Sequence, residues 1–136
     1  VHLMAGREAG ATVMRGFTTV RDTGGPVFGL KQAIDQGAVS GPRIFPSGAM
    51  LSQTSGHGDF RLLNSLPRMP SDPADYTERT GVAAIADGRD EVLRRTREQL
   101  MKGASQIKIM AGGGVASPYD PLDTAQYTLD GMRAAV

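Results

Sequence analysis

Short apolar segments alternate along this chain with segments of helical periodicity, and this alternation restricts the possible folds more than any other feature. Strand-like segments lie at 17–20, 43–47 and 107–111, and helix-like segments at 1–15, 27–36, 88–102 and from 129 onward. Such alternation gives a parallel sheet with helices packed outside it. We therefore expect an α/β fold; alternation alone leaves open whether the sheet is a closed barrel or an open doubly wound sheet.

The stretch 50–87 lacks a sustained period and is rich in turn residues and prolines. A loop this long within a domain is usually functional or disordered. It follows a strand, and in α/β folds the loops after strands carry the active site. We predict a long loop over 50–87 on the active-site face. The helices that follow should begin at Asp87 and Thr128 as N-caps.

Charge and composition exclude several classes of function. The net charge is +1, which gives no reason to expect binding to nucleic acid or to a membrane surface. The chain has no cysteine, so disulfides, thiolate nucleophiles and cysteine metal sites are ruled out. With no apolar run of membrane-spanning length and no leader pattern, we expect a cytoplasmic protein whose partners are small molecules or other protein chains.

Lys108 lies in the middle of the strand predicted over 107–111, where an ammonium group is costly unless it is paired or neutralised. Because side chains alternate along a strand, Ile107 and Ile109 share one face. Lys108 and Met110 share the other, which in a barrel points inward. A buried neutral lysine can act as a nucleophile, form a Schiff base or become a carbamate. The simpler alternative is a lysine whose ammonium reaches solvent from a strand end.

His57 lies in the segment Ser-Gly-His-Gly-Asp at 55–59, at the start of the long loop. The flanking glycines let the backbone approach a ligand, and the carboxylate of Asp59 can orient the ring. The alternative is a surface histidine without a function. The other histidine, His2, falls in the first predicted helix, so the chain has no HxH or HExxH pair to bind a metal.

Three glycines at 112–114 follow the predicted strand, without the spacing of GxGxxG or the GK[ST] of a P-loop, and phosphate binding is a poor interpretation of them. Acidic residues after strands can serve as general acids, general bases or metal ligands, although each alone is typical of a turn or a helix cap. These residues are Asp22, Asp59, Asp120 and Asp123.

Five blocks of sequence, in order and covering nearly the whole chain, resemble enzymes of the amidohydrolase superfamily, in the group of imidazolonepropionase-like enzymes and Xaa-Pro dipeptidases (prolidase-like). The blocks are GFTTVRDTGG at 16–25, GPRIFPSG at 41–48, SGHGDFR at 55–61, ADGRDEVLRRTREQLMKGASQIKIMAGGGV at 86–115 and YDPLDTAQYT at 119–128.

The resemblance implies a (βα)8 TIM barrel with a binuclear zinc site. It implies that Lys108, in the IK block, is the carboxylated lysine that bridges both metals. His57 corresponds to a histidine that contacts the carbonyl or carboxylate of the substrate, and Tyr119 is a weaker candidate for substrate contact. The other metal ligands of the family, an HxH on the first strand, two further histidines and an aspartate, have no counterpart in residues 1–136.

We therefore expect residues 1–136 to be one incomplete barrel domain, covering roughly helix 1 to helix 4. The full-length protein should hydrolyse amide or peptide bonds of dipeptides or N-acyl amino acids with a metal-activated water. This chain alone should be inactive and hold no zinc. The alternatives are a cyclic amidohydrolase or deaminase on the same scaffold, or a non-catalytic partial barrel that associates with itself. In each case we expect a homo-oligomer, because a partial barrel exposes sheet edges.

Overall fold

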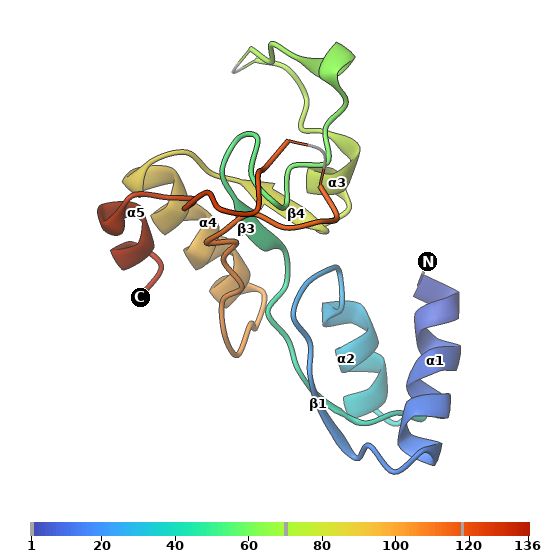
Figure 1. The fold of residues 1–136 in the computed structure, drawn as a ribbon. Coiled ribbons are helices and arrows are strands. Elements are labelled where there is room, and N and C mark those ends of the chain that lie inside the picture. Colours follow the sequence, from blue (N-terminus) through green and yellow to red (C-terminus); the bar gives the residue numbers. More distant parts are fainter. Residues whose placement is uncertain (1, 70, 118) are drawn as a thin grey trace.

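The computed structural model describes residues 2–69, 71–117 and 119–136. Figure 1 shows two groups of elements joined by the segment that runs from the second strand to the third. One group holds the N-terminal helices and strands, and the other holds the remainder of the chain. The described residues form two pairs of parallel strands and no closed barrel, so the α/β class is confirmed.

The N-terminal group alternates helix and strand as the sequence predicts. It consists of α1 (His2–Met14), β1 (Thr19–Arg21), α2 (Phe28–Asp35) and β2 (Arg43–Phe45). Strands β1 and β2 are parallel, with Val20 opposite Ile44. Ile44 is buried, as is Ala9 of α1, and Figure 1 shows both helices on one side of the strand pair. His2 lies in α1, as expected.

The second group is built around β3 (Met50–Ser52), which has parallel neighbours on both sides. On one side it pairs with β4 (Ala83–Ile85), with Leu51 opposite Ala84. On the other side Leu51 forms a parallel bridge with Ile109. The amide of Leu51 donates to the carbonyl of Lys108 at 2.9 Å, and the amide of Met110 donates to the carbonyl of Leu51 at 2.9 Å. Residues 108–110 therefore add a third parallel segment beside β3.

The prediction of one uninterrupted loop over 50–87 is wrong. The stretch contains β3, the 3-10 helix η1 (Leu63–Ser65), α3 (Tyr76–Arg79) and β4. Each element has only three or four residues, which is too short to produce a visible period. The alanines of β4 are also poor strand formers, and burial rather than propensity holds them in place.

The strand predicted over 107–111 is shorter than expected, because Ile109 makes only an isolated bridge. The bridge joins Ile109 to the single residue Leu51 of β3. The chain then leaves the sheet, and Gly112 forms an antiparallel bridge with Ala125.

Helix α4 (Arg89–Met101) packs beside β3, and α5 (Leu129–Arg133) packs against α4. Their shared core contains Leu51, Ala86 and Val92, and the residues packed against it are Ile107, Ile109, Tyr127, Ala134 and Ala135. Thr128 caps α5 as predicted, since its hydroxyl accepts from the amide of Gly131 at 3.2 Å. The predicted cap of α4 is wrong. Gly88 takes that position with φ 78°, and the carboxylate of Asp87 instead accepts from the amide of Thr54 at 2.9 Å.

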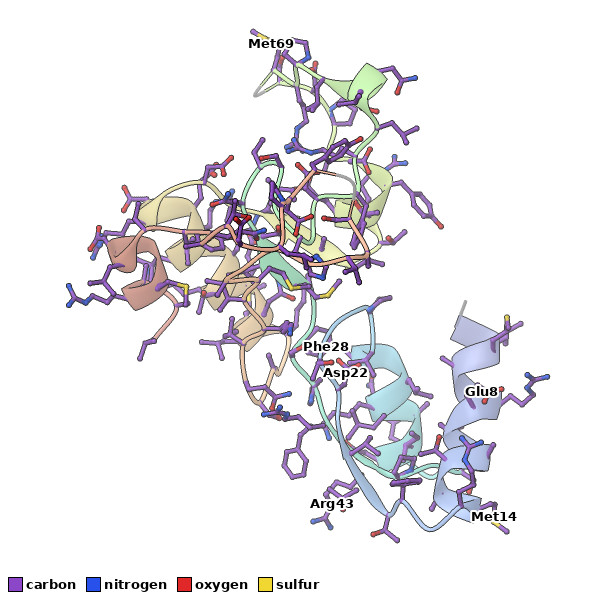
Figure 2. All side chains as sticks on the ribbon, viewed as in Figure 1. Glu8, Met14, Asp22, Phe28, Arg43 and Met69 are labelled. Carbon is purple, nitrogen blue, oxygen red and sulfur yellow. The ribbon has the colours of Figure 1, made fainter. Side chains whose placement is uncertain are left out.

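A fully buried segment, residues 46–49, connects β2 to β3 and ties the two groups together. The amide of Ala49 donates to Oε1 of Gln99 in α4 at 3.0 Å. Gly48 has φ 72°, and a Cβ there would lie 2.5 Å from Oε1 of Gln99 and 2.7 Å from the ring of Phe28 in α2. Figure 2 shows Phe28 at the end of α2 that faces the second group. Only glycine fits this crossing point.

No helix in the described part of the chain combines the length and apolar character needed to cross a membrane.

Candidate active site

Lys108 lies on the face of its segment that is turned away from the helices. Ile107 and Ile109 pack against the core under α4 and α5, so alternation places Lys108 and Met110 on the opposite face. There Met110 approaches the loop that carries His57, because its Cγ lies 3.6 Å from the position of a Cβ on Gly58. The face that carries Lys108 is thus shared with the histidine loop, while the lysine itself is only partly buried.

His57 is held by a carboxylate that lies 63 residues further along the chain. Its Nδ1 is 3.1 Å from Oδ2 of Asp120, whose side chain is 1% exposed, whereas the side chain of His57 is 26% exposed. One side of the ring thus contacts a buried carboxylate, and part of the ring is accessible to solvent. An acceptor-only carboxylate requires Nδ1 to carry a proton, which leaves Nε2 for another partner.

Asp120 joins the loop after β3 to the loop after Ile109. Its Oδ2 also accepts from the amide of Gly114 at 2.8 Å and from Nε2 of Gln126 at 3.4 Å. Oε1 of Gln126 in turn accepts from the amide of His57 at 3.1 Å. The other oxygen of Asp120, Oδ1, is buried and has no hydrogen-bond partner among the described residues. The histidine is therefore bonded through both its ring and its backbone.

The glycine run at 112–114 lets these loops pack against each other closely. A Cβ on Gly114 would lie 2.1 Å from Cε1 of His57, and a Cβ on Gly113 would lie 1.9 Å from the carbonyl oxygen of Pro121. Any side chain at either position would displace the ring or the backbone. Gly113 packs closely against Pro121 and Gly114 against His57. This packing accounts for both glycines, so phosphate binding is not needed to explain them.

Asp59 does not orient His57, contrary to the interpretation from sequence. Its buried carboxylate forms a bidentate ion pair with Arg61, at 2.7 Å to Nε and 2.6 Å to Nη2, and accepts from the amide of Ser55 at 2.8 Å. Burial raises the pKa of Asp59, but the bonds from Arg61 and Ser55 outweigh burial and hold that pKa below its usual value. The carboxylate of Asp59 therefore bonds within its own loop, to Arg61 and Ser55, and fixes the shape of that loop.

Tyr119 lies next to this cluster, and its hydroxyl is already bonded. The hydroxyl donates to the carbonyl of Arg61 at 3.0 Å, and the side chain is partly buried. Tyr119 thus supports the turn that contains Asp59 and Arg61.

The remaining acidic candidates lie apart from His57. Oδ2 of Asp22, at the end of β1, accepts from the amide of Gly24 at 3.3 Å. Burial raises the pKa of Asp22 despite this bond. Asp123 is exposed. Of the four acidic residues, the structure brings only Asp120 to the ring, and sequence reasoning gave it no more weight than the others. The distance in sequence between Asp120 and His57 hid the pair.

Lys108 is the one residue of this chain that the resemblance names as a metal ligand. The described residues contain no group of three or more histidine, cysteine, aspartate or glutamate side chains placed to hold a metal ion. Zinc sites take three or four protein ligands. The donors described here do not by themselves make such a site.

Comparison with known proteins identifies relatives over nearly the full chain. The profile of the amidohydrolase family matches residues 5–136. Ochratoxinase from Aspergillus niger is 38% identical over 130 residues, which is 91% of this chain and 27% of that protein. The chain thus spans less than a third of the length of this relative.

Solved structures show the same relationship. The crystal structure of an amidohydrolase superposes with a TM-score of 0.87 at 48% identity, over 99% of this chain and 33% of that one. A prolidase complexed with N-methylphosphonate-L-proline superposes with a TM-score of 0.79 at 48% identity, over 94% of this chain and 31% of that one. The resemblance inferred from the sequence blocks is confirmed. The chain belongs to the amidohydrolase family.

Proposed function

We propose that the full-length protein containing this chain hydrolyses amide or peptide bonds of dipeptides or N-acyl amino acids. The observation that carries the proposal is the 48% identity to a prolidase whose structure holds a phosphonate analogue attached to proline. The identity extends over 94% of this chain, so the loops after β3 and after Ile109 both fall within the similar region. A substrate with a carboxylate on the C-terminal side of the scissile bond is the form we favour.

The fold supports placing this chain in the first half of a (βα)8 barrel, from helix 1 to helix 4. In this proposal β1 belongs to the second barrel strand, β2 and β3 are successive parts of the third, and residues 108–110 belong to the fourth. The support is the parallel pairing of β1 with β2 and the parallel bridge between β3 and Ile109. The segment 46–49 continues directly from β2 to β3, as one bent strand would.

Lys108 is the residue that we propose as a carboxylated lysine bridging a binuclear zinc site. Its place on the face opposite Ile107 and Ile109 supports this role. All other metal ligands would come from outside residues 1–136. Bound zinc would supply an activated water as the nucleophile.

His57 is the residue that we propose to contact the carbonyl or carboxylate of the substrate. Its partial exposure and its position on the same side as Lys108 support this role. Tyr119 is the weaker candidate, because its hydroxyl already donates to the carbonyl of Arg61 and would have to leave it before it could donate to a substrate.

Activity of the full-length protein on a substrate panel tests the proposal. The panel should contain Xaa-Pro dipeptides, N-acyl amino acids, cyclic amides and aminated heterocycles. We expect hydrolysis of the first two classes and loss of activity when N-acyl amino acids are replaced by their amides, which lack the carboxylate. Activity confined to cyclic amides or to deamination would support the alternative chemistry on this scaffold and contradict our proposal.

A further inference from the structure

We infer that Asp120 is a positioning residue, which fixes the ring of His57 through Nδ1 so that Nε2 is the nitrogen presented to the substrate. This inference rests on the proposed function, because Asp120 would act on the reaction only through His57. It adds a residue whose place in the sequence gave no sign of such a role.

The contacts around the ring carry the inference. Oδ2 of Asp120 lies 3.1 Å from Nδ1 of His57 and 2.8 Å from the amide nitrogen of Gly114. The ring also lies against Gly114, where a Cβ would come within 2.4 Å of Nδ1. Gln126 holds the backbone of His57 at 3.1 Å. The orientation and the position of the ring are therefore set by one loop.

The difference in burial between Asp120 and His57 determines which nitrogen of the ring can reach a substrate. The carboxylate of Asp120 is almost fully buried, whereas the imidazole is partly exposed. Since an ionised carboxylate only accepts hydrogen bonds, Nδ1 keeps its proton and Nε2 is left free. A neutral ring then offers a lone pair at Nε2, and a doubly protonated ring offers a donor to a carbonyl or carboxylate oxygen. A histidine whose far nitrogen is fixed by a carboxylate is a recurrent way to orient an imidazole for catalysis or binding.

The asparagine variant separates hydrogen bonding from gross structure. In Asp120→Asn the amide of Gly114 continues to require an acceptor, which places the new carbonyl oxygen at the Oδ2 position and the new NH2 group at the Oδ1 position. Oδ1 has no partner among the described residues, so no existing hydrogen bond is lost there. The bond to Nδ1 of His57 is therefore retained in Asp120→Asn and lost in Asp120→Ala.

A double-mutant cycle in the full-length protein tests the coupling. We expect Asp120→Ala to lower kcat/KM about a hundredfold, as a misplaced binding group does, with the same division between kcat and KM as His57→Ala. In the His57→Ala background, Asp120→Ala should lower kcat/KM by less than about threefold, because coupled residues are not additive. Asp120→Asn should retain most of the activity. Asp123→Asn, on the same loop but exposed, is the matched control and should leave activity unchanged.

Nitrogen-15 NMR of histidine-labelled full-length protein provides a measurement besides activity, with His57 assigned from His57→Gln. We expect a protonated Nδ1 in the wild type and in Asp120→Asn. In Asp120→Ala, and in Gly114→Ala, which displaces the ring without changing the carboxylate, we expect averaging between tautomers.

Several results would overturn the inference: additive losses in the cycle, an Asp120→Asn variant as impaired as Asp120→Ala, an unprotonated Nδ1 in the wild type, or a His57→Ala variant with wild-type kinetics. None of these results would affect the proposed amide hydrolysis, which the wild-type protein and the substrate panel test by themselves.

Discussion

At the scale of single residues, the ion pair between Asp59 and Arg61 stands out because both side chains are buried. A buried pair that loses one partner leaves an uncompensated charge, which costs about 3–5 kcal/mol. We predict that Asp59→Asn lowers the free energy of unfolding by about this amount, measured by urea unfolding. Asp123→Asn, at an exposed position, is the control. Equal costs for the two variants would show that the pair does not stabilise the fold.

The lowered pKa of Asp59 also predicts how the free energy of unfolding changes in acid. Its pKa lies below the usual aspartate value, since the bonds from Arg61 and Ser55 outweigh the effect of burial. As the pH falls, the unfolded chain takes up its proton first. The stability that Asp59 contributes is therefore fully present above the usual aspartate pKa and is lost as the pH falls through the lower folded-state value.

The measurement is the free energy of unfolding at a series of pH values from about 6 down to 2. We expect the wild type to lose more stability over this range than Asp59→Asn does. If the two proteins lose stability equally, a carboxylate other than Asp59 controls the fall in the free energy of unfolding at low pH.

The sequence revealed part of the site at this scale. Lys108 and His57 were found because each departs from its local pattern, a charge in an apolar strand and a histidine between glycines. Asp120 was not singled out, because its bond to His57 depends on the meeting of two loops far apart in sequence. Asp59 was misread for the converse reason: it is close to His57 in sequence, but Arg61 binds it.

At the scale of elements, Gln99 links α4 to the segment between β2 and β3. Its buried Oε1 accepts from the amide of Ala49. We predict that Gln99→Met, which nearly preserves volume, lowers the free energy of unfolding by about 1–3 kcal/mol, because the amide of Ala49 is left unpaired. Arg97→Met on the exposed face of α4 is the control. Thermal unfolding of both variants measures the difference; a Gln99→Met protein as stable as the control would contradict the prediction.

The three long helices and the first two strands were predicted well from sequence, whereas the short elements between residues 50 and 87 were not. The positions of α1, α2 and α4 follow from their periodicity, and β1 and β2 from β-branched or aromatic residues near glycine and proline. By contrast, α3 is a single turn, with a capping box between Asp75 and Glu78 and with contacts to other elements. Its Glu78 forms ion pairs with Arg95 of α4 and with Arg68. The ion pair with Arg95 joins residues far apart in sequence and leaves no local pattern, whereas the capping box is a local signal that sequence reasoning missed.

At the scale of the whole molecule, large apolar side chains lie on the surface of the described chain. They include Leu3, Met4, Met14, Phe17, Leu62, Leu63, Met101 and Val115. Exposed apolar surface and unpaired strand edges favour association. We predict that residues 1–136 expressed alone self-associate, as measured by sedimentation velocity over a range of concentrations. A monomer at every concentration would contradict the prediction.

The central claim for the whole molecule is that Lys108 holds metal in an amidohydrolase active site. The most direct test is the metal content of the purified full-length protein, measured by elemental analysis for the wild type, for Lys108→Ala and for Lys102→Ala. Lys102 is the control because it is exposed at the end of α4. We predict that the wild type and Lys102→Ala carry zinc in equal amounts and that Lys108→Ala loses most of it. A Lys108→Ala protein with as much zinc as the wild type would contradict the assignment.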